Sequence, residues 1–346
     1  MKHGPYPGRL PMSGQIAMEH GAGGKASAQL TAQLFQRHFD DPALMAGDDG
    51  ARLTLPPGDV VMSTDSFVVS PRRFPGGDIG TLAVCGTVND LAMMGARPIA
   101  LTMGFILEEG LPLAELEAIA ASMAECARRA GVRLVAGDTK VVERGHGDGV
   151  FINTAGVGVV PPGRRLGAAR VAEGDVVIVS GPVGDHGACV LAQRPGYDLD
   201  IDVESDCAPL NQLAAALLAA APSTHAMRDP TRGGVAAALN EIAWTAGLGF
   251  ALDEDAIPVR PAVAAACDLL GLEPLDLPCE GRLLAFVPEA EAAAALAALH
   301  AHPQGRDAAI IGRAVADARH LVVASTGFGG RRLVEWRAGE PLPRIC

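Results

Sequence analysis

Residues 98–142 read PIALTMGFILEEGLPLAELEAIAASMAECARRAGVRLVAGDTKVV. Apolar residues fill both ends of this stretch, which predicts one strand from Pro98 to Leu107 and another from Val132 to Val142. Between them, Leu113 to Ala130 repeats apolar residues at helical spacing and predicts a helix. A strand, a helix and a further strand in succession predict an α/β fold.

The alternation of strand and helix continues on both sides of this stretch. Asp59 to Ser70 predicts a strand, Gly80 to Gly95 a helix, and Phe151 to Val160 the strand that closes the set. The next residues, Pro161 to Arg165, cluster proline, glycine and charge, which is typical of a linker. We therefore expect a first α/β domain at residues 1–160.

A second α/β unit follows this linker. A chain of 346 residues is too long for one ordinary core, so two domains fit its length. We expect the second domain at residues 166–338 and a flexible tail at residues 339–346. The predicted strands are Asp175 to Ser180, Leu283 to Val287, Ala309 to Gly312 and Leu321 to Ala324, and the predicted helices are Asn211 to Ala220, Val235 to Ala246, Ala262 to Leu270 and Ala290 to His300.

The chain ends in PLPRIC, residues 341–346, so its last side chain is the thiol of Cys346. Pro341 and Pro343 fix φ and donate no backbone hydrogen bond, which predicts an extended arm. At about 3.1 Å per residue, the residues from Glu340 onward would reach roughly 20 Å, far enough to carry the thiol into a neighbouring cleft. The alternative is a frayed terminus with an incidental cysteine.

The composition excludes several classes of function. The formal net charge is −12 and no basic run occurs, which argues against nucleic acid and anionic membranes as partners. No apolar run approaches the roughly 18 residues of a membrane span, and residues 1–18 contain no signal-peptide core. We expect a cytoplasmic globular protein.

The seven cysteines are odd in number and show no C-x-x-C spacing. Neither a disulfide framework nor a zinc site is therefore indicated. Most of these cysteines lie in apolar surroundings and are predicted to be buried thiols, so Cys346 is the exception.

A glycine-rich segment, HGAGGK at residues 20–25, precedes a helical pattern from Ala26 to Phe39. Glycines let a backbone approach a phosphate closely, and free N–H groups at the start of a helix point toward it. The segment is no P-loop, because Glu19 stands where a glycine is needed and Ala26 follows Lys25. A plain flexible turn is the alternative. The glycines in question are Gly21, Gly23 and Gly24.

Three aspartates recur near strand ends or helix faces, namely Asp65, Asp90 and Asp138. Carboxylates of this kind suit Mg²⁺, which takes oxygen ligands and shares them with substrate phosphates. Taken singly, each would more often be a cap or turn residue. Together with the glycine-rich segment they predict a nucleotide-phosphate site, in which Asp185 or Asp229 could replace any of the three.

Two further motifs carry charge at the boundaries of predicted elements. Arg228 to Gly234, RDPTRGG, leads into a predicted helix, which suits either an anion cradle or a structural turn with solvated arginines. Glu280 stands between Cys279 and Gly281 just before a predicted strand, where it could be a base or a turn acid.

Seven motifs spread over nearly the whole chain: HGAGG (20–24), STDS (63–66), GDTKV (137–141), GDHG (184–187), RDPTRGG (228–234), EG (280–281) and PRIC (343–346). Together they resemble the HypE family of hydrogenase maturation proteins, within the superfamily of aminoimidazole ribonucleotide synthetases and selenophosphate synthetases. The terminal PRIC separates this family from its relatives. The resemblance says little about residues before Gln15 or from Pro195 to Ser205.

The resemblance implies a two-domain aminoimidazole ribonucleotide synthetase-like fold, an extended tail, and a homodimer formed by the first domain. It also implies an ATP-dependent carbamoyl dehydratase. A carbamoyltransferase of the HypF type would load a carbamoyl group onto Cys346, and the enzyme would convert the adduct to a thiocyanate while ATP becomes ADP and phosphate. The cyano group would pass to iron on a HypC–HypD scaffold complex, as a cyanide ligand of the nickel–iron centre.

The resemblance assigns roles to the acidic residues and the glycine-rich segment. Asp65, Asp90 and Asp138 would hold Mg²⁺, with all three beside the bound nucleotide. The glycines of residues 21–24 would cover the phosphates, and Thr139 would complete the ATP-binding residues.

The implied dehydration needs two more groups. A carboxamide oxygen is a poor leaving group until it is phosphorylated, and a base must then remove an N–H proton. Lys140 and Glu280 are the candidates: one would stabilise the phosphorylated oxygen and the other would take the proton, and which does which is open. For a base that works near neutral pH, we expect either burial of Glu280 or a cationic neighbour beside Lys140.

Two other functions fit parts of the same pattern. The first is a small-molecule kinase of the same superfamily, although selenophosphate synthetases use a cysteine or selenocysteine near the N-terminus and here no cysteine precedes Cys85. The second is a nucleotide-gated scaffold that presents the terminal arm without turning over ATP. Hydrolysis of ATP that depends on carbamoylation of Cys346 would separate the enzyme from the scaffold.

Overall fold

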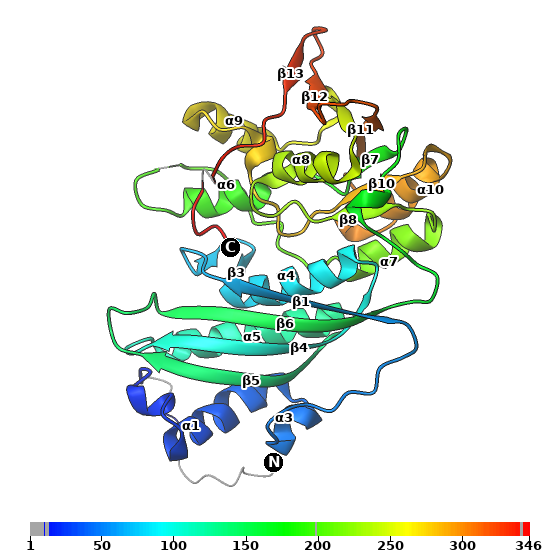
Figure 1. Ribbon diagram of the computed structural model, residues 1–346. Coiled ribbons are helices and arrows are strands. Elements are labelled where there is room, and N and C mark those ends of the chain that lie inside the picture. Colours follow the sequence, from blue (N-terminus) through cyan, green and yellow to red (C-terminus); the bar gives the residue numbers. More distant parts are fainter. Residues whose placement is uncertain (1–9, 11–13, 198, 340–341) are drawn as a thin grey trace.

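The computed structural model describes residues 10, 14–197, 199–339 and 342–346 (Figure 1). Glu340 and Pro341 of the predicted tail lie outside the described residues. Two sheets dominate the fold, one in the lower half of Figure 1 and one in the upper half, and a long helix lies between them. Within the described ranges, no helix is long and apolar enough to cross a membrane.

The lower sheet has the strand order β1-β6-β4-β5. Its strands are β1 (Asp59–Phe67), β6 (Val150–Val160), β4 (Arg97–Glu108) and β5 (Arg133–Val142). β4 and β5 run parallel because α5 (Leu113–Ala130) carries the chain from one to the other, whereas the other two pairs are antiparallel. The predicted strand, helix and strand of residues 98–142 are confirmed.

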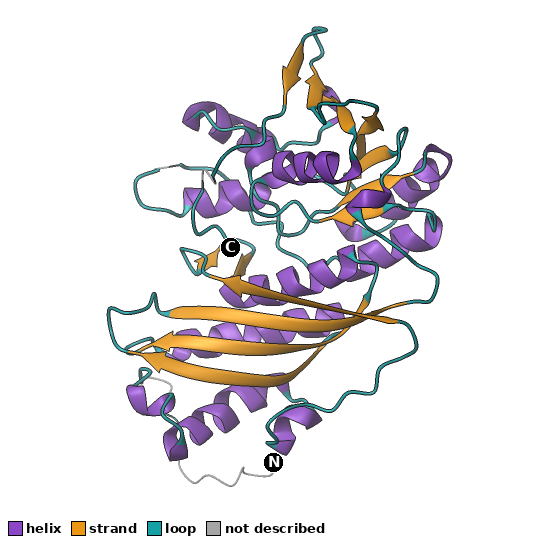
Figure 2. Ribbon diagram, in the orientation of Figure 1, coloured by secondary structure: helices purple, strands orange, loops and turns teal. Residues whose placement is uncertain are grey.

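Helices cover one face of this sheet (Figure 2). α4 (Ile79–Met93) is buried on nearly every side, since the lower sheet lies against one flank and the upper half of the protein against the other. Thr154 of β6 anchors α4, because its hydroxyl lies 2.6 Å from the Thr87 hydroxyl and donates to the Ala83 carbonyl at 2.8 Å.

The opposite face of the lower sheet is left open in the single chain. Along β1 the side chains of Val60 and Met62 are 55% and 75% exposed. Ile106 of β4 is also exposed, further along the same face, where it pairs with Phe151 of β6. Large apolar side chains on a solvent-facing sheet are typical of a surface that another protein covers.

The N-terminal helices lie at the β5 edge of the lower sheet (Figure 1). The helix predicted at residues 26–39 is present as α1 (Gly24–Leu30), a π-helical turn at Thr31–Phe35 and α2 (Gln36–Phe39). The ring of Phe35 lies 4.6 Å from that of Phe105, which fastens these helices to β4. A further short helix, α3 (Pro42–Ala46), was not predicted.

The upper sheet has the strand order β13-β12-β9-β11-β7-β10-β8. α8 covers one of its faces, and α7 and α10 cover the other, so the central strands are buried throughout. The strands are β7 (Val176–Val179), β8 (Ala226–Arg228), β9 (Gly249–Asp253), β10 (Leu284–Val287), β11 (Ala309–Val315), β12 (Val322–Ser325) and β13 (Arg331–Leu333). The helices are α6 (Asp185–Ala192), α7 (Asn211–Ala220), α8 (Gly234–Ala246), α9 (Pro261–Leu270) and α10 (Glu289–His300).

Several short elements of the upper half escaped the sequence patterns. α6 was not predicted and begins directly after Gly184, which adopts a left-handed φ of 83°. β8, β9 and β13 have only three to five residues each, too few for a periodic signal. A small hairpin, β2 (Arg73–Phe74) and β3 (Gly77–Asp78), lies between β1 and α4.

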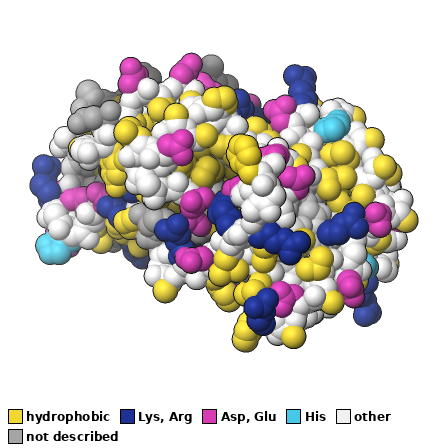
Figure 3. Space-filling model, turned by 90° about the horizontal axis from the view of Figure 1, so that it is seen from above, with side chains coloured by type: hydrophobic (Ala, Val, Ile, Leu, Met, Phe, Trp, Pro, Cys, Tyr) yellow, Lys and Arg dark blue, Asp and Glu magenta, His cyan; other side chains and the backbone are white. Residues whose placement is uncertain are grey.

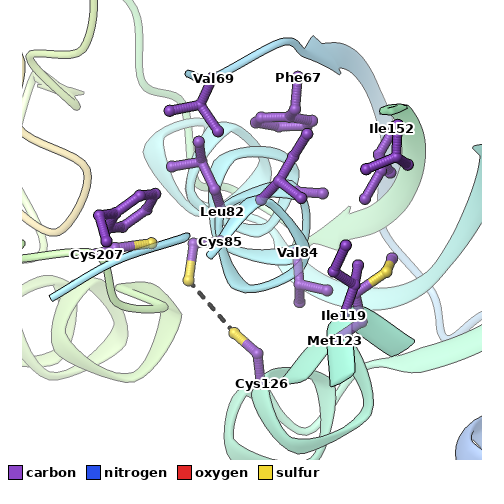
Figure 4. Close-up of a cluster of buried hydrophobic side chains, with 14 of the residues drawn as sticks. Phe67, Val69, Leu82, Val84, Cys85, Ile119, Met123, Cys126, Ile152 and Cys207 are labelled. Atoms are coloured by element: carbon purple, nitrogen blue, oxygen red, sulfur yellow. Dashed lines mark hydrogen bonds between the residues drawn. The ribbon is translucent and has the colours of Figure 1, made fainter. Parts of the chain in front are cut away.

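One apolar cluster joins elements of both halves. Figure 4 shows its centre, where Cys85 of α4 lies beside Cys126 of α5, with their sulfur atoms 3.3 Å apart, and near Cys207 from the upper half. Leu342 and Ile345 of the tail belong to the same cluster. Because the core crosses from one half to the other, the division at residues 161–165 remains a prediction.

The contacts of Asp41 at the β5 edge predict a measurable contribution to the free energy of unfolding. Its carboxylate caps α3 by accepting from the Ala43 N–H, and it accepts two hydrogen bonds of 2.8 Å from Arg133 at the start of β5. The hydrogen bonds from Arg133 lower the pKa of this carboxyl, so its stabilising effect is present above its ordinary pKa of 3.8 and lost as pH falls through the lowered value. Asp41→Ala should lower the free energy of unfolding by about 2 kcal/mol at pH 7.

Urea unfolding followed by circular dichroism measures this difference. Asp48→Ala, at an exposed neighbouring aspartate, is the matched control and should cost far less. The gap between wild type and Asp41→Ala should narrow below about pH 4. A gap of the same size at pH 7 and pH 3 would contradict the assigned role of the ionised carboxylate.

Candidate active site

The candidate site residues fall into two groups, and the first group lines a pocket at the β5 edge. The pocket has a volume of about 220 Å³ and is open on one side. Phe35, Phe39 and Phe105 give it apolar walls, which suit a planar base. The predicted residues among its lining are Gly21, Gly23, Asp138, Thr139 and Lys140.

The glycine-rich segment needs its glycines. Gly23 and Gly24 adopt φ values of 82° and 78°, which favour glycine, and a Cβ on Gly21 would lie 2.4 Å from the Val141 backbone nitrogen. Ser27 holds the segment closed, since its hydroxyl accepts from the Gly23 N–H at 2.9 Å and donates to the Glu19 carbonyl at 3.2 Å. The backbone therefore passes close to β5 and to the pocket, as a phosphate-covering loop requires.

Asp138 and Lys140 form an ion pair on β5. The ammonium of Lys140 lies 2.6 Å from the Asp138 carboxylate, which also accepts from the Thr139 N–H at 2.9 Å. The hydrogen bond from Lys140 is the main reason that the pKa of Asp138 is lowered. Both side chains are well exposed, so the pair can open when a phosphate competes for the ammonium.

The second group lies between α4 and the upper half of the protein. Asp65 of β1 and Asp90 of α4 are half-buried there, and Glu280 and Asp229 are buried beside them. The Ser63 hydroxyl donates to Asp90 at 2.5 Å. These carboxylates come from four separate segments, which only the packing of the two halves brings together.

Asn89 fastens these segments to one another. Its side-chain amide donates to the carbonyls of Ala208 and Glu280 at 3.2 and 3.3 Å, and its oxygen accepts from the Leu210 N–H at 2.8 Å. The side chain is 1% exposed, so these bonds form away from water. The backbone of Glu280 is thereby held directly above α4, next to Asp90.

The carboxylates of this group repel one another. Burial raises the pKa of Glu280 well above its ordinary value, and burial with the nearby charge of Asp90 raises the pKa of Asp229 to about 7. Burial also raises the pKa values of Asp65 and Asp90, while Arg232 opposes the rise. Glu280 Oε1 is buried and has no hydrogen-bond partner, so it is available to accept a proton or to face a cation.

In one chain Asp138 is remote from Asp65 and Asp90. β1 and β5 lie at opposite edges of the sheet, about 14 Å apart at three strand spacings of about 4.8 Å. The pairing register places Asp138 in the row of Ser66 and Asn153 on the open face, whereas Asp65 lies in the row of Thr154, which faces α4. Among the residues described, no group of three or more His, Cys, Asp or Glu side chains is arranged to hold a metal ion.

The donor set of the second group nevertheless suits a hard cation. Asp65 and Asp90 supply carboxylate oxygens, and the unpartnered Glu280 oxygen lies in the same crowded acidic region. A divalent ion that takes oxygen ligands would relieve the repulsion. The residues present therefore fit Mg²⁺, with further ligands required from the nucleotide, water or a second chain.

The motif at residues 228–234, predicted to be either an anion cradle or a structural turn, leads directly into α8. Arg228 forms an ion pair with Glu241 of α8, and Arg232 lies near Asp65 and Asp90. Gly233 and Gly234 both adopt left-handed backbone conformations where α8 begins. On the face shown in Figure 3, basic side chains lie interspersed with acidic ones.

Cys346 lies at the end of a docked tail. Its main-chain oxygen accepts from the Val68 N–H at 3.1 Å, just beyond β1, and its side chain is half-buried against the apolar cluster. Arg344 adopts a φ of 55°, so the described tail bends and is not one continuous extended arm. The contacts that hold it involve His186 and Arg194, which the sequence patterns did not single out as site residues.

The raised pKa of Asp229 predicts how the thermal stability of the protein changes with pH. A carboxyl whose folded pKa is raised to about 7 stabilises the fold below its ordinary pKa of 3.8 and loses that contribution as pH rises through 7. Without nucleotide or divalent ions, Asp229→Asn should therefore raise the melting temperature at pH 8 by about 2–4 °C and leave it nearly unchanged at pH 4. Thermal unfolding of both proteins across this range, with the exposed Asp200→Asn as the control, measures the effect. An equal shift at both pH values would contradict it.

The comparisons with known proteins agree with this architecture. Family models of AIR synthase related proteins match the chain, the N-terminal domain at residues 47–160 and the C-terminal domain at residues 172–324. The carbamoyl dehydratase HypE of Azotobacter vinelandii is 54% identical over 334 residues, which cover 96% of this chain and 98% of the relative.

Solved structures give the same result. The hydrogenase maturation protein HypE in complex with ATP matches with a TM-score of 0.91 at 48% identity, covering 95% of this chain and 99% of that one. A HypE–HypF complex matches with a TM-score of 0.78 at 43% identity, covering 90% of this chain and 99% of that one. The chain therefore belongs to the HypE family of hydrogenase maturation proteins, the carbamoyl dehydratases.

Proposed function

We propose that the protein uses ATP to dehydrate an S-carbamoyl group on its own Cys346 to a thiocyanate, and so supplies the cyanide ligand of a nickel–iron centre. The observation that carries the proposal is the position of the chain end: Cys346 docks beside the end of β1, the strand that also carries Asp65. The name of the relatives, carbamoyl dehydratase, and the HypE structure with ATP support the reaction and its second substrate.

The proposed reaction balances in two steps. The carbamoyl oxygen attacks the γ-phosphorus of ATP, ADP leaves, and the nitrogen loses its first proton. The carbon–oxygen bond then breaks, the oxygen departs as part of inorganic phosphate, and loss of the second nitrogen proton completes the carbon–nitrogen triple bond. Both steps depend on positioning and on neutralising charge at the transferred phosphoryl group.

Glu280 and Lys140 are the proposed catalytic residues. Glu280 has a buried oxygen without a hydrogen-bond partner and a pKa that burial raises, properties that suit an acid–base group. Lys140 carries a positive charge at the rim of the β5 pocket, where it suits the phosphorylated oxygen. The division of the two roles stays open.

Asp65, Asp90 and Asp138 are the residues that we propose hold Mg²⁺. When bound, Mg²⁺ would neutralise charge on the phosphates. The glycine-rich segment and Thr139 would bind the nucleotide in the β5 pocket.

We further propose that the protein works as a homodimer. In one chain Lys140 and Asp138 lie at the opposite edge of the lower sheet from Asp65 and the Glu280 region. The open face of that sheet carries the exposed side chains of Val60, Met62 and Ile106, which a second copy would cover. Such pairing would let the β5 edge of one chain complete the acidic group of the other.

The partners follow from the covalent chemistry. A carbamoyltransferase of the HypF type would load the thiol, which the HypE–HypF complex supports. A HypC–HypD scaffold would receive the cyano group on iron. Both partners need the chain end outside its docked position, so the tail must alternate between bound and free.

Mass measurement of the C-terminal peptide tests the reaction. After incubation with carbamoyl phosphate, ATP, Mg²⁺ and the partner carbamoyltransferase, Cys346 should gain one carbamoyl group and then lose one water. Glu280→Gln should stop at the carbamoyl adduct, with dehydration slowed by about 100-fold or more, because a positioned acid–base group contributes about that much. Glu173→Gln, on an exposed loop, is the matched control and should turn over normally.

Two other outcomes would contradict the proposed dehydration. If Cys346 stays unmodified while the partner is demonstrably active, the dehydratase proposal fails. If the adduct forms and persists in the wild-type protein with ATP and Mg²⁺, the chain end acts as a carrier only.

Mixing two inactive variants tests the homodimer. If Glu280 of one chain works with Lys140 of the other, Glu280→Gln and Lys140→Met homodimers should each be inactive. Subunit exchange between equal amounts should then restore about a quarter of wild-type activity, since half of the dimers would contain one intact site of two. No recovery, although native mass spectrometry detects mixed dimers, would place both residues in the same chain's site.

A further inference from the structure

The docked tail is held mainly through its backbone carbonyls. His186 Nε2 lies 2.8 Å from the Ile345 carbonyl oxygen. The guanidinium of Arg194 donates to the carbonyls of Pro343 and Arg344 at 2.7 Å each, and also to the Ser70 carbonyl at 2.8 Å. The Ile345 carbonyl is therefore fixed by a buried imidazole, and the carbonyls of Pro343 and Arg344 are fixed by one guanidinium nitrogen that they share.

The imidazole of His186 has only one proton arrangement that fits. A carbonyl oxygen only accepts, so Nε2 carries the hydrogen; Nδ1, 2.8 Å from the Ser205 hydroxyl, must then accept from it. The side chain is fully buried and its ring meets Phe74 edge-on at 5.3 Å. Burial lowers the pKa of His186 to about 4, which agrees with a neutral ring at physiological pH.

The tail also pairs with the segment that follows β1. The N–H groups of Val68 and Ser70 donate to the main-chain oxygen of Cys346 and to the Arg344 carbonyl, at 3.1 Å each. Meanwhile Ile345 and Leu342 are 1% and 2% exposed, so both side chains are inserted into the apolar cluster. The tail thus occupies a groove in which its apolar side chains are buried, and its carbonyl groups are bound by His186 of α6 and by Arg194 just after that helix.

The loop at residues 205–207 links the groove to Glu280, the candidate base. Ser205, which donates to His186, also accepts from the Cys207 N–H at 3.1 Å. Between these two residues, Asp206 accepts from the N–H of Glu280 at 3.0 Å. This loop therefore contacts both His186, which binds the tail, and the backbone of Glu280.

We propose that His186 and Arg194 are positioning residues that hold the last residues of the chain in this groove and so set the place of the Cys346 sulfur for dehydration. The catalytic part of this inference rests on the proposed function, whereas the docking part does not. The hydrogen bonds from His186 and Arg194 end on backbone carbonyls of the tail, so both residues are assigned to positioning and not to a reaction with the cargo on the thiol.

These backbone contacts suit a tail that must also dissociate from the groove. Backbone carbonyls that lose His186 and Arg194 on release are hydrated at once, so undocking leaves no buried polar group on the tail. The buried side chains of Leu342 and Ile345 select this peptide, while the carbonyl contacts fix its register. The groove is therefore a reversible binding site for the chain's own terminal peptide.

The alkylation rate of Cys346 by iodoacetamide measures docking without any catalysis. The other six cysteines are buried, so the native protein should react first at Cys346, which mass spectrometry of the C-terminal peptide can confirm. His186→Leu and Arg194→Lys should each raise this rate by about five- to tenfold, the effect of losing roughly one buried hydrogen bond. His186→Gln, which keeps a donor near the Nε2 position, should stay within about twofold of wild type.

Two further variants complete the set, one as a control and one as a second test of the imidazole. Arg313→Lys, at an exposed arginine of β11, should leave the alkylation rate unchanged. Ser205→Ala keeps the imidazole but frees its tautomer, and should raise the rate by about two- to threefold. Should His186→Leu fail to fold, Arg194→Lys and Ser205→Ala still decide the question, because neither removes an apolar core side chain.

The second readout is single-turnover dehydration of the carbamoyl adduct. The variants that raise alkylation should slow dehydration by a similar factor, and His186→Gln should recover both. Wild-type alkylation rates in folded His186→Leu and Arg194→Lys would overturn the inference. If the alkylation pattern appears but wild-type protein never dehydrates the adduct, docking stands and the proposed function fails.

Discussion

The structure depends on the burial of α4 between its two sheets. This helix packs on the lower sheet through Thr87 and carries Asn89, whose side chain binds the backbone at Leu210, Ala208 and Glu280. Because that amide is buried, each lost bond would leave an unsatisfied polar group away from water. The position of Glu280 relative to Asp90 is therefore a consequence of how two separate sheets meet on one helix.

In the absence of a ligand, the acidic group at this junction lowers the free energy of unfolding. Burial and mutual repulsion raise the pKa values of Asp229 and Glu280, which means that ionising them destabilises the folded state. Structures that retain such a cost usually do so at functional sites. The β5 pocket shows the opposite character, since the Asp138 carboxylate is already paired with Lys140 at an exposed rim.

The docked tail contacts both halves of the protein. It docks against the segment after β1 and against α6, so it touches the lower sheet and the upper half at once. The tail is held by its backbone carbonyl contacts, by the buried side chains of Leu342 and Ile345, and by the side chain of Arg344, which donates to the Val68 carbonyl and pairs with Asp148. The backbone carbonyls become hydrated when the tail is released, so release leaves none of them unpaired. A terminal cysteine held in this way can be delivered repeatedly to the same position and still reach other proteins.

Sequence alone determined the α/β architecture of residues 98–142, the strands and helices of the lower sheet, and the set of motifs that marks the family, because hydrophobic period and local motifs are properties of contiguous residues. It also singled out Glu280, Lys140 and Cys346. Only the tertiary structure decided that Asp138 lies far from Asp65 in one chain, that Glu280 is buried among other acids, and that His186 grips the tail. Distances between segments remote in sequence depend on strand order, register and packing, and no local pattern encodes them.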